Sequence, residues 1–377
     1  MTASVVASMS CDNGPVEPTF GQFAMERVLV GPRYGKVLVR GDTAFTARTD
    51  GLMEAVTISG GRTLWRARLR SDGVPLMSPS AVLTRDLLVI GVAGRVIALR
   101  RSDGSEAWRY EDPARPTLAD YEIATDSDYV SFGEQRGRAT ALNARTGAIV
   151  WQRQLMADDP QSATRGLLFI DGLLVLQRNR SSVDAADGEP LVFAVRAATG
   201  EAVWTIRVNR AALLDNWGGQ STVAGPGRIV FALKSGRIFS VSPADGVVQW
   251  TAAPLTTSPG DFRDLVVSGT QLLASCVTAP AGVQALRLSD GAQEWFLESP
   301  VGAAISGLAV SPGQVSYSAF GGQLLTIDRT TRRASVIDAD AIRVSGVGAV
   351  FFPTPVYAGE LLLAPTSEGL VVLRPRR

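Results

Sequence analysis

The 377-residue sequence contains no histidine, almost no lysine and only two cysteines, Cys11 and Cys276. Without histidine it cannot form a Ser-His-Asp triad, a histidine-ligated zinc centre or a histidine-ligated haem. It also lacks the side chain that most often acts as a general base at neutral pH. The two cysteines are far apart, so they form no Cys-x-x-Cys motif, and they would pair only if the fold brought them together.

An excess of charge of either sign is also missing. The sequence has 37 basic and 36 acidic side chains, a formal charge of +1. This balance disfavours a protein that binds nucleic acid or an anionic membrane surface through a basic face. No apolar run approaches 18 residues, so we expect no transmembrane helix. A hydrophobic content of 46% with 19% charged residues fits a well-packed folded chain.

What the sequence does contain is an eleven-residue repeat that begins with a small residue, has glycine at position seven and ends in tryptophan. Six of the seven tryptophans belong to it. The copies are Ala55–Trp65, Ala98–Trp108, Ala141–Trp151, Ala194–Trp204, Ser240–Trp250 and Ala285–Trp295. Their glycines are Gly61, Gly104, Gly147, Gly200, Gly246 and Gly291. Successive tryptophans are 43, 43, 53, 46 and 45 residues apart.

A seventh copy, Thr326–Val336, keeps the frame but has Arg332 in place of glycine and Val336 in place of tryptophan. Upstream of each copy lies an apolar run broken by a turn, such as Pro79–Leu99, which predicts two strands. The motif glycine supplies a turn, and the residues leading to tryptophan predict a further strand. Each unit is therefore expected to contain three or four antiparallel strands.

An eighth unit is split between the two ends of the chain. Residues Pro353–Pro375 repeat the first half of a unit and stop before a tryptophan strand, while Phe23–Val30 is a strand-like run before the first unit. Donating this run to the eighth unit would close a ring and remove exposed sheet edges. We therefore predict an all-β, eight-bladed propeller over residues 23–377, preceded by an extended tail over residues 1–22.

These repeats resemble the tryptophan-docking motif of the PQQ-like propellers, the superfamily of quinoprotein alcohol dehydrogenases and of BamB-like outer-membrane assembly lipoproteins. The resemblance covers nearly the whole chain after Phe23. It implies four-stranded antiparallel blades, with each motif tryptophan packed between blades near the motif glycine of a neighbour. The family's usual aspartate at motif position three is present only as Asp328, which suggests a divergent branch.

The resemblance leaves the function open, because propellers include enzymes, scaffolds and sensors. A quinoprotein dehydrogenase binds PQQ and Ca²⁺ and carries two adjacent cysteines, which this chain lacks. We therefore expect no catalytic, cofactor-binding or metal-binding residues. The favoured reading is a scaffold or accessory subunit that binds other proteins of a membrane-associated complex, such as an outer-membrane assembly, respiratory or photosynthetic complex. The alternatives are a PQQ/Ca²⁺-dependent dehydrogenase and a ligand-binding sensor.

Candidate partner-binding residues lie outside the repeat. Trp217 and Asn216 are in the connection between the fourth and fifth units, where an exposed tryptophan is typical of an interface, although it could also pack under its own loop. Phe20 and Phe23 are expected to anchor the tail on a larger assembly. The long polar insertion Gln177–Phe193 is either a binding loop or a solvated hairpin.

The compartment is indicated only by resemblance. Residues 1–22 contain neither a basic segment nor an apolar segment typical of a signal peptide. Cys11 invites comparison with a lipoprotein cleavage site, but Ser8, Met9 and Ser10 match that pattern poorly. Family resemblance implies a peripheral protein of the periplasm or cell envelope, and a cytoplasmic location stays open.

Overall fold

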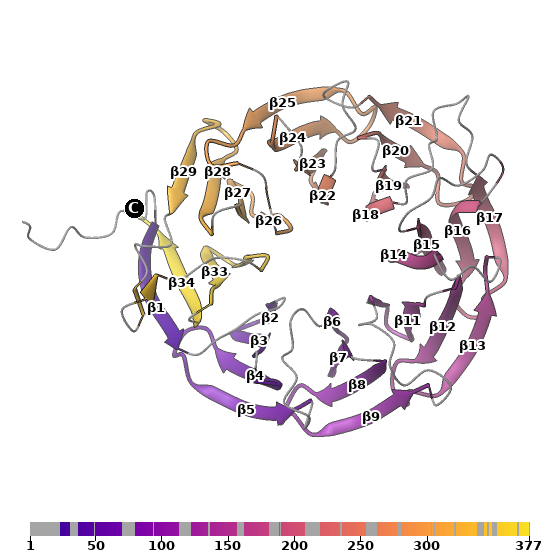
Figure 1. Ribbon diagram of the computed structural model, residues 1–377, viewed down its shortest axis with the longest axis horizontal. Helices are drawn as coiled ribbons and strands as arrows, with labels where there is room; N and C mark the ends of the chain where they lie inside the picture. Colours follow the sequence, from indigo (N-terminus) through magenta and orange to yellow (C-terminus); the bar gives the residue numbers. More distant parts are fainter. Residues whose placement is uncertain are drawn as a thin grey trace, which may run out of the picture.

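Eight four-stranded antiparallel sheets stand side by side in a closed ring (Figure 1). The computed structural model describes residues 23–30, 37–48, 50–69, 80–92, 94–112, 122–134, 136–156, 162–180, 188, 190–207, 219–233, 236–253, 262–277, 280–302, 304, 306–319, 322–337, 343–344, 347–348, 353–367 and 369–376. All secondary structure within these residues is strand or turn. The predicted eight-bladed propeller is therefore confirmed.

The blades are numbered from the amino terminus, and the four strands of each are given from the inside of the ring outward. Blade 1 contains β2 (Leu38–Arg40), β3 (Thr43–Ala47), β4 (Leu52–Thr57) and β5 (Thr63–Arg68), and blade 2 contains β6 (Ser80–Leu83), β7 (Leu87–Val92), β8 (Arg95–Arg100) and β9 (Glu106–Glu111). Blade 3 contains β10 (Ile123–Thr125), β11 (Tyr129–Gly133), β12 (Arg138–Asn143) and β13 (Ile149–Gln154), and blade 4 contains β14 (Ser162–Ile170), β15 (Leu173–Arg180), β16 (Pro190–Arg196) and β17 (Ala202–Arg207).

The second half of the ring follows the same order. Blade 5 contains β18 (Gly219–Gly225), β19 (Arg228–Leu233), β20 (Ile238–Val241) and β21 (Val248–Ala252), and blade 6 contains β22 (Phe262–Ser268), β23 (Gln271–Cys276), β24 (Gly282–Arg287) and β25 (Gln293–Glu298). Blade 7 contains β26 (Ala309–Val310), β27 (Gln314–Ser318), β28 (Leu324–Asp328) and β29 (Ala334–Ile337). Blade 8 contains β32 (Val356–Ala358), β33 (Leu361–Pro365), β34 (Gly369–Pro375) and β1 (Phe23–Val30), and a short pair, β30 (Arg343–Val344) and β31 (Val347–Gly348), precedes it.

The amino-terminal strand closes the ring, as predicted. β1 pairs antiparallel with β34, from Phe23 opposite Pro375 to Val30 opposite Gly369. The Arg374 Nε atom lies 2.7 Å from Glu26 Oε1 across this pair. The two ends of the chain are thus joined in one sheet, in which β1 is held by backbone pairing with β34, by this ion pair and by the packing of Phe23.

Burial follows the position of each strand within a blade. All six residues of β7, a second strand, are buried, because both faces of the sheet are covered by neighbouring blades. In the outermost strand β13 only Trp151 is buried. The inner strands read as continuous apolar runs because both of their faces are buried. The outermost strands mix apolar and polar residues because most of their side chains are exposed. Within the described residues, none of the structure is a helix that could span a bilayer.

Candidate partner-binding site

Each motif tryptophan of blades 1 to 5 lies against the motif glycine of the next blade. A Cβ atom placed on Gly104 would lie 2.5 Å from Cε3 of Trp65, and Gly104 has φ +74°. The equivalent closest approaches are 2.6 Å for Gly147 to Trp108, 2.7 Å for Gly200 to Trp151, 2.8 Å for Gly246 to Trp204 and 2.5 Å for Gly291 to Trp250. Glycine is required for two reasons, since a side chain would collide with the indole and the backbone is left-handed.

The five indoles also donate a hydrogen bond to the same backbone position. Each Nε1 donates to the carbonyl oxygen of motif residue four in the next blade, and the acceptors are Arg101 (2.9 Å), Ala144 (3.1 Å), Ala197 (2.8 Å), Pro243 (2.8 Å) and Leu288 (3.0 Å). A one-residue β-bulge directly before each of these five tryptophans directs the indole toward the next blade. These side chains therefore hold adjacent blades together, and their polar atoms are already engaged.

Two seams around blade 8 are built differently. β29 pairs with β28 without a bulge, so Ser335 lies opposite Thr326, the first motif residue, and Val336 lies opposite Leu325. In the closing blade, Arg27 is opposite Val372 directly after a bulge, which is the register position that tryptophan takes elsewhere. Leu29 Cδ2 would lie 2.8 Å from a Cβ atom on Gly61. Blade 8 is thus bounded on both sides by contacts made without tryptophan.

Nearer the centre, hydrogen bonds between adjacent blades form what we call the inner belt. Its members link the six seams from blade 2 to blade 8: Ile123 N to Ser80 Oγ (3.1 Å), Glu134 N to Thr164 Oγ1 (2.9 Å), Gln177 Nε2 to Thr222 Oγ1, Leu265 N to Ser221 Oγ (3.1 Å), Leu308 N to Asp264 Oδ2 (2.9 Å) and Gly307 N to Thr354 Oγ1 (2.9 Å). In five of these links a side-chain oxygen accepts from a backbone N–H of the neighbouring blade, and the sixth joins two side chains.

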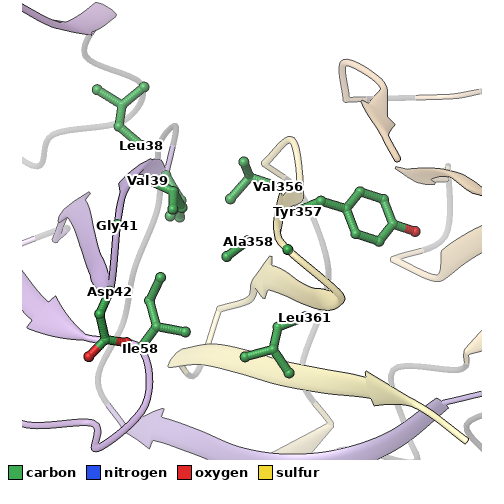
Figure 2. Close-up of a pocket in the computed structure, with 11 residues that line it drawn as sticks. Leu38, Val39, Gly41, Asp42, Ile58, Val356, Tyr357, Ala358 and Leu361 are labelled. Carbon is green, nitrogen blue, oxygen red and sulfur yellow. The ribbon is translucent and has the colours of Figure 1, made fainter. Parts of the chain in front are cut away.

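A groove of about 670 Å³ lies at the seam where blade 8 meets blade 1. Figure 2 shows aliphatic side chains of β2 and β32 facing one another across it. The lining side chains are Val37, Leu38, Val39, Asp42, Ile58, Val356, Tyr357, Ala358 and Leu361. The groove combines residues from the two ends of the chain, and its walls offer mainly apolar contact.

The polar groups of this groove are already engaged. The Tyr357 hydroxyl points away from the groove (Figure 2) and lies 2.7 Å from Ser316 Oγ and 3.0 Å from Gln314 Oε1. Burial raises the pKa of Tyr357 to about 12. Asp42 accepts hydrogen bonds from the hydroxyl of Ser59 (2.5 Å) and from its backbone N–H (2.8 Å), and these bonds lower the pKa of Asp42. Neither side chain is arranged as a general acid or base at neutral pH.

A second groove, of about 440 Å³, lies at the seam between blades 1 and 2. Arg101 covers the Phe45 ring at 5.9 Å and donates from Nη1 to the carbonyl oxygens of Thr84 (3.3 Å) and Arg85. The Arg100 side chain donates to Ser105 Oγ at 3.1 Å. Arg100 and Arg101 therefore bind backbone and hydroxyl groups of their own blade.

Buried charges elsewhere are paired within the ring. Glu54, a fully buried residue, accepts from Arg66 Nε at 3.1 Å. Arg138 bridges Glu134 and Asp112 at 2.5 Å each, which ties the end of blade 2 to blade 3. In the part of the chain that the structure describes, no three Cys, Asp or Glu side chains are grouped to hold a metal ion.

The predicted partner-binding residues have different outcomes. Trp217, Asn216 and Phe20 lie outside the described residues. Phe23 was expected as an anchor to a larger assembly, but it is completely buried in a cluster shared by blades 7 and 8, which contains Leu324 and Leu373. The strand that closes the ring needs this apolar side chain for its own packing, so Phe23 is not available to a partner.

Cys276 and the two ends of the polar insertion are buried. Cys276 is a buried residue of β23, and burial raises the pKa of its thiol to about 12, which keeps it protonated and unreactive. Cys11 lies outside the described residues. The polar insertion begins and ends inside blade 4, with Gln177 in β15 and Phe193 in β16, and both ends are buried.

The sequence did not predict the two grooves. Their lining residues are ordinary aliphatic and polar residues of inner strands and turns, and nothing in the repeat distinguishes them from their counterparts in other blades.

Comparisons with known proteins agree with this architecture. A profile of the family described as "Outer membrane protein assembly factor BamB" matches residues 19–191 and 189–376. The curated protein outer membrane protein assembly factor BamB of Yersinia pestis is 24% identical over 178 residues, which are 45% of this chain and 44% of that protein. The match thus spans less than half the length of this relative.

Solved structures show the same fold at low identity. BamB from Moraxella catarrhalis has a TM-score of 0.62 and 17% identity, over 93% of this chain and 97% of that chain. A europium-containing methanol dehydrogenase has a TM-score of 0.69 and 13% identity, over 91% of this chain and 84% of that chain. Because a BamB protein and a methanol dehydrogenase both match over more than nine-tenths of this chain at under 20% identity, these likenesses show the fold alone.

Proposed function

We propose, because this chain belongs to the family of the outer membrane protein assembly factor BamB, that it is a non-catalytic propeller scaffold. It would serve as an accessory subunit of a membrane-associated complex of the cell envelope, with an outer-membrane assembly complex favoured over a respiratory or photosynthetic one. The observation that carries the proposal is the match of the family profile over nearly the whole chain, from residue 19 to residue 376.

Two features of the chain support a binding role rather than a catalytic one. The sequence lacks the pair of adjacent cysteines that the family resemblance assigns to quinoprotein dehydrogenases. The geometry that recurs in the repeat serves blade packing, since each indole of blades 1 to 5 contacts a glycine and donates to a carbonyl of the next blade. A rigid ring of this kind presents fixed surfaces to partners.

The proposal extends to location and organisation. We place the protein at the periplasmic side of the envelope, held there by protein partners and without a membrane span of its own. We treat residues 23–377 as one propeller domain and residues 1–22 as an extended tail, with Trp217, Asn216 and Phe20 as candidate contacts to partners.

A reciprocal pull-down from native membranes tests the scaffold role. The tagged chain should recover the same membrane-complex subunit that, when tagged itself, recovers this chain in a fixed ratio. The enzyme alternative is tested by incubating the purified protein with PQQ and Ca²⁺. Quinone absorbance that survives desalting, together with dye reduction by alcohols or sugars, would overturn the scaffold proposal.

A further inference from the structure

The outer rim of the ring consists of eight sheet edges. In every blade the outermost strand pairs with one neighbour only, so its other edge presents backbone N–H and C=O groups to the surroundings. Such edges can pair with a strand from another chain, and soluble proteins usually protect them with charged side chains. The rim strands of this protein differ in how far they are protected.

Charged side chains protect most of the rim. β9 carries Glu106, Arg109 and Glu111, with Arg109 Nη2 at 2.7 Å from Glu106 and Nη1 at 3.3 Å from Glu111. β25 carries Glu294 and Glu298. Arginines lie within β5 and β13 in the same way. A strand added at these edges would have to displace or desolvate the charges.

Three rim strands, β17, β21 and β29, have no charged residue before their last position, and β29 (ASVI) has no exposed large apolar side chain. β17 reads AVWTIR, with its one charged residue at the end, and β21 reads VQWTA, with none. Val203 is 37% exposed, Val247 59% and Val248 41%. Exposed apolar side chains also lie at Ile149 (53%) and Val150 (40%) of β13, but that strand carries Arg153 within its span. Trp204 is partly exposed, whereas the other five motif tryptophans are buried.

The exposed apolar residues of the two blades are neighbours. Trp204 of blade 4 contacts Gly246 of blade 5, and Val247 directly follows that glycine. We call the residues Val203, Trp204 and Ile206 of β17, with Val247 and Val248, the rim patch. It joins an unprotected strand edge to an apolar surface, which are the two features that strand addition uses.

We propose that the outer edge of β17 accepts an extended segment of a partner protein as a fifth, antiparallel strand of blade 4. The inference rests on the proposed scaffold function and names its interaction surface. The charges at the ends of β17 specify the segment further. Glu201 precedes the strand and Arg207 ends it, and both are exposed. An antiparallel partner would therefore begin with an acidic residue beside Arg207, continue with about five uncharged β-formers and end with a basic residue beside Glu201.

The shape of the rim argues against a second copy of this chain as the occupant. The rim is convex (Figure 1), and β17 has six residues. Two such rims would meet along one short strand pair and bury much less than the roughly 800 Å² per partner of a stable complex. An extended segment can follow the strand and also cover the neighbouring valines of blade 5.

A defined peptide tests the proposal. The probe is fluorescently labelled acetyl-EVTVTVR-amide, and its binding to the full-length protein is followed by anisotropy. Two control peptides are the reversed sequence RVTVTVE and an N-methylated probe that keeps the side chains but lacks the N–H donors. Both controls should bind at least tenfold more weakly. Equal binding of the N-methylated probe would show adsorption to apolar surface and would overturn strand addition.

Protein variants locate the site. Val203→Glu should weaken binding of the probe at least tenfold, because it places a charge beside the added strand. Leu64→Glu is the matched control, since Leu64 is 40% exposed and also directly precedes a motif tryptophan. The affinity of this variant for the probe should stay within twofold of that of wild type. Val247→Glu provides a second test if Val203→Glu fails to fold by circular dichroism. Equal binding by the rim and control variants, or a wild-type dimer in sedimentation that Val203→Glu dissociates, would overturn the proposal.

The same variants separate this inference from the scaffold proposal. If both wild type and Val203→Glu recover a reciprocal partner from native membranes, the scaffold role holds and the role of β17 is refuted. If wild type recovers no partner, the scaffold proposal fails. Selective loss of the partner with Val203→Glu, but not with Leu64→Glu, supports both.

Discussion

The guanidinium of Arg332 lies 5.9 Å from the centre of the Trp295 indole, at the place where five other tryptophans meet a glycine. Arg332 adopts the same left-handed backbone as those glycines, with φ 58°, and its N–H still donates to Asp328 O at 2.8 Å. The turn of blade 7 is therefore preserved without its glycine, and a cation over the indole replaces close contact between the backbone and the ring.

The glycine contact predicts a large effect of a single methyl group. Gly104→Ala should destabilise the fold by about 2–4 kcal/mol, from a left-handed alanine and a collision with the Trp65 indole. Gly172→Ala is the matched control, because Gly172 has the same φ of +74° but nothing within 4 Å of the added carbon. It should cost only about 1–2 kcal/mol. Urea unfolding measures both, and equal losses would refute the role of the indole contact.

Removing a docking tryptophan should cost more than removing an exposed apolar residue. Trp108→Ala leaves a cavity between blades 2 and 3 and is expected to lower the free energy of unfolding by about 3–5 kcal/mol. Val247→Ala, on the exposed rim, should change it by less than about 0.5 kcal/mol. A Trp108→Ala protein as stable as wild type in chemical denaturation would contradict the docking role.

Blade 8 should open more readily than blade 2. Its two seams are made without tryptophan, and its outer strand β1 comes from the opposite end of the chain. We expect the amides of Leu362 and Leu363 in β33 to exchange with deuterium at least tenfold faster than those of Val89 and Ile90 in β7. All four residues are completely buried, so accessibility alone does not explain a difference. Uniform exchange in the two strands would show that the tryptophans do not set local stability.

The Asp42–Ser59 pair predicts a pH dependence. The Ser59 hydroxyl lowers the pKa of Asp42, so the carboxylate contributes stability above its unfolded pKa of about 3.9 and loses it as the pH falls through the lower folded pKa. Ser59→Ala should raise the pKa of Asp42 in an NMR titration, and its destabilisation should be larger at pH 7 than at pH 3. Ser289→Ala, at the same repeat position in blade 6, should leave Asp42 unchanged. If the pKa of Asp42 were unchanged in Ser59→Ala, the Ser59 hydroxyl would not be the cause of the lowered pKa.

The fold was predictable because one local pattern is repeated. Tryptophan and glycine recur in a fixed frame, and each pair marks a turn and an outer strand whose geometry depends on neighbours within eleven residues. The split eighth blade followed from the same frame, because Pro353–Pro375 lacks an outer strand and Phe23–Val30 supplies one. The apolar residues of the rim patch are visible in the sequence, but they indicate a binding surface only once the structure shows which strands form the outer edges.

Only the tertiary structure decided what lies at the closing seam. Arg27 takes the place of tryptophan, and Phe23 is buried rather than exposed, because β1 joins a sheet made by residues more than 300 positions away. The apolar groove at this seam is likewise shared between residues 37–58 and residues 356–361. A repeat specifies contacts that depend on local spacing, whereas the register between two distant ends of a chain is set by packing, which becomes visible only when the ring is closed.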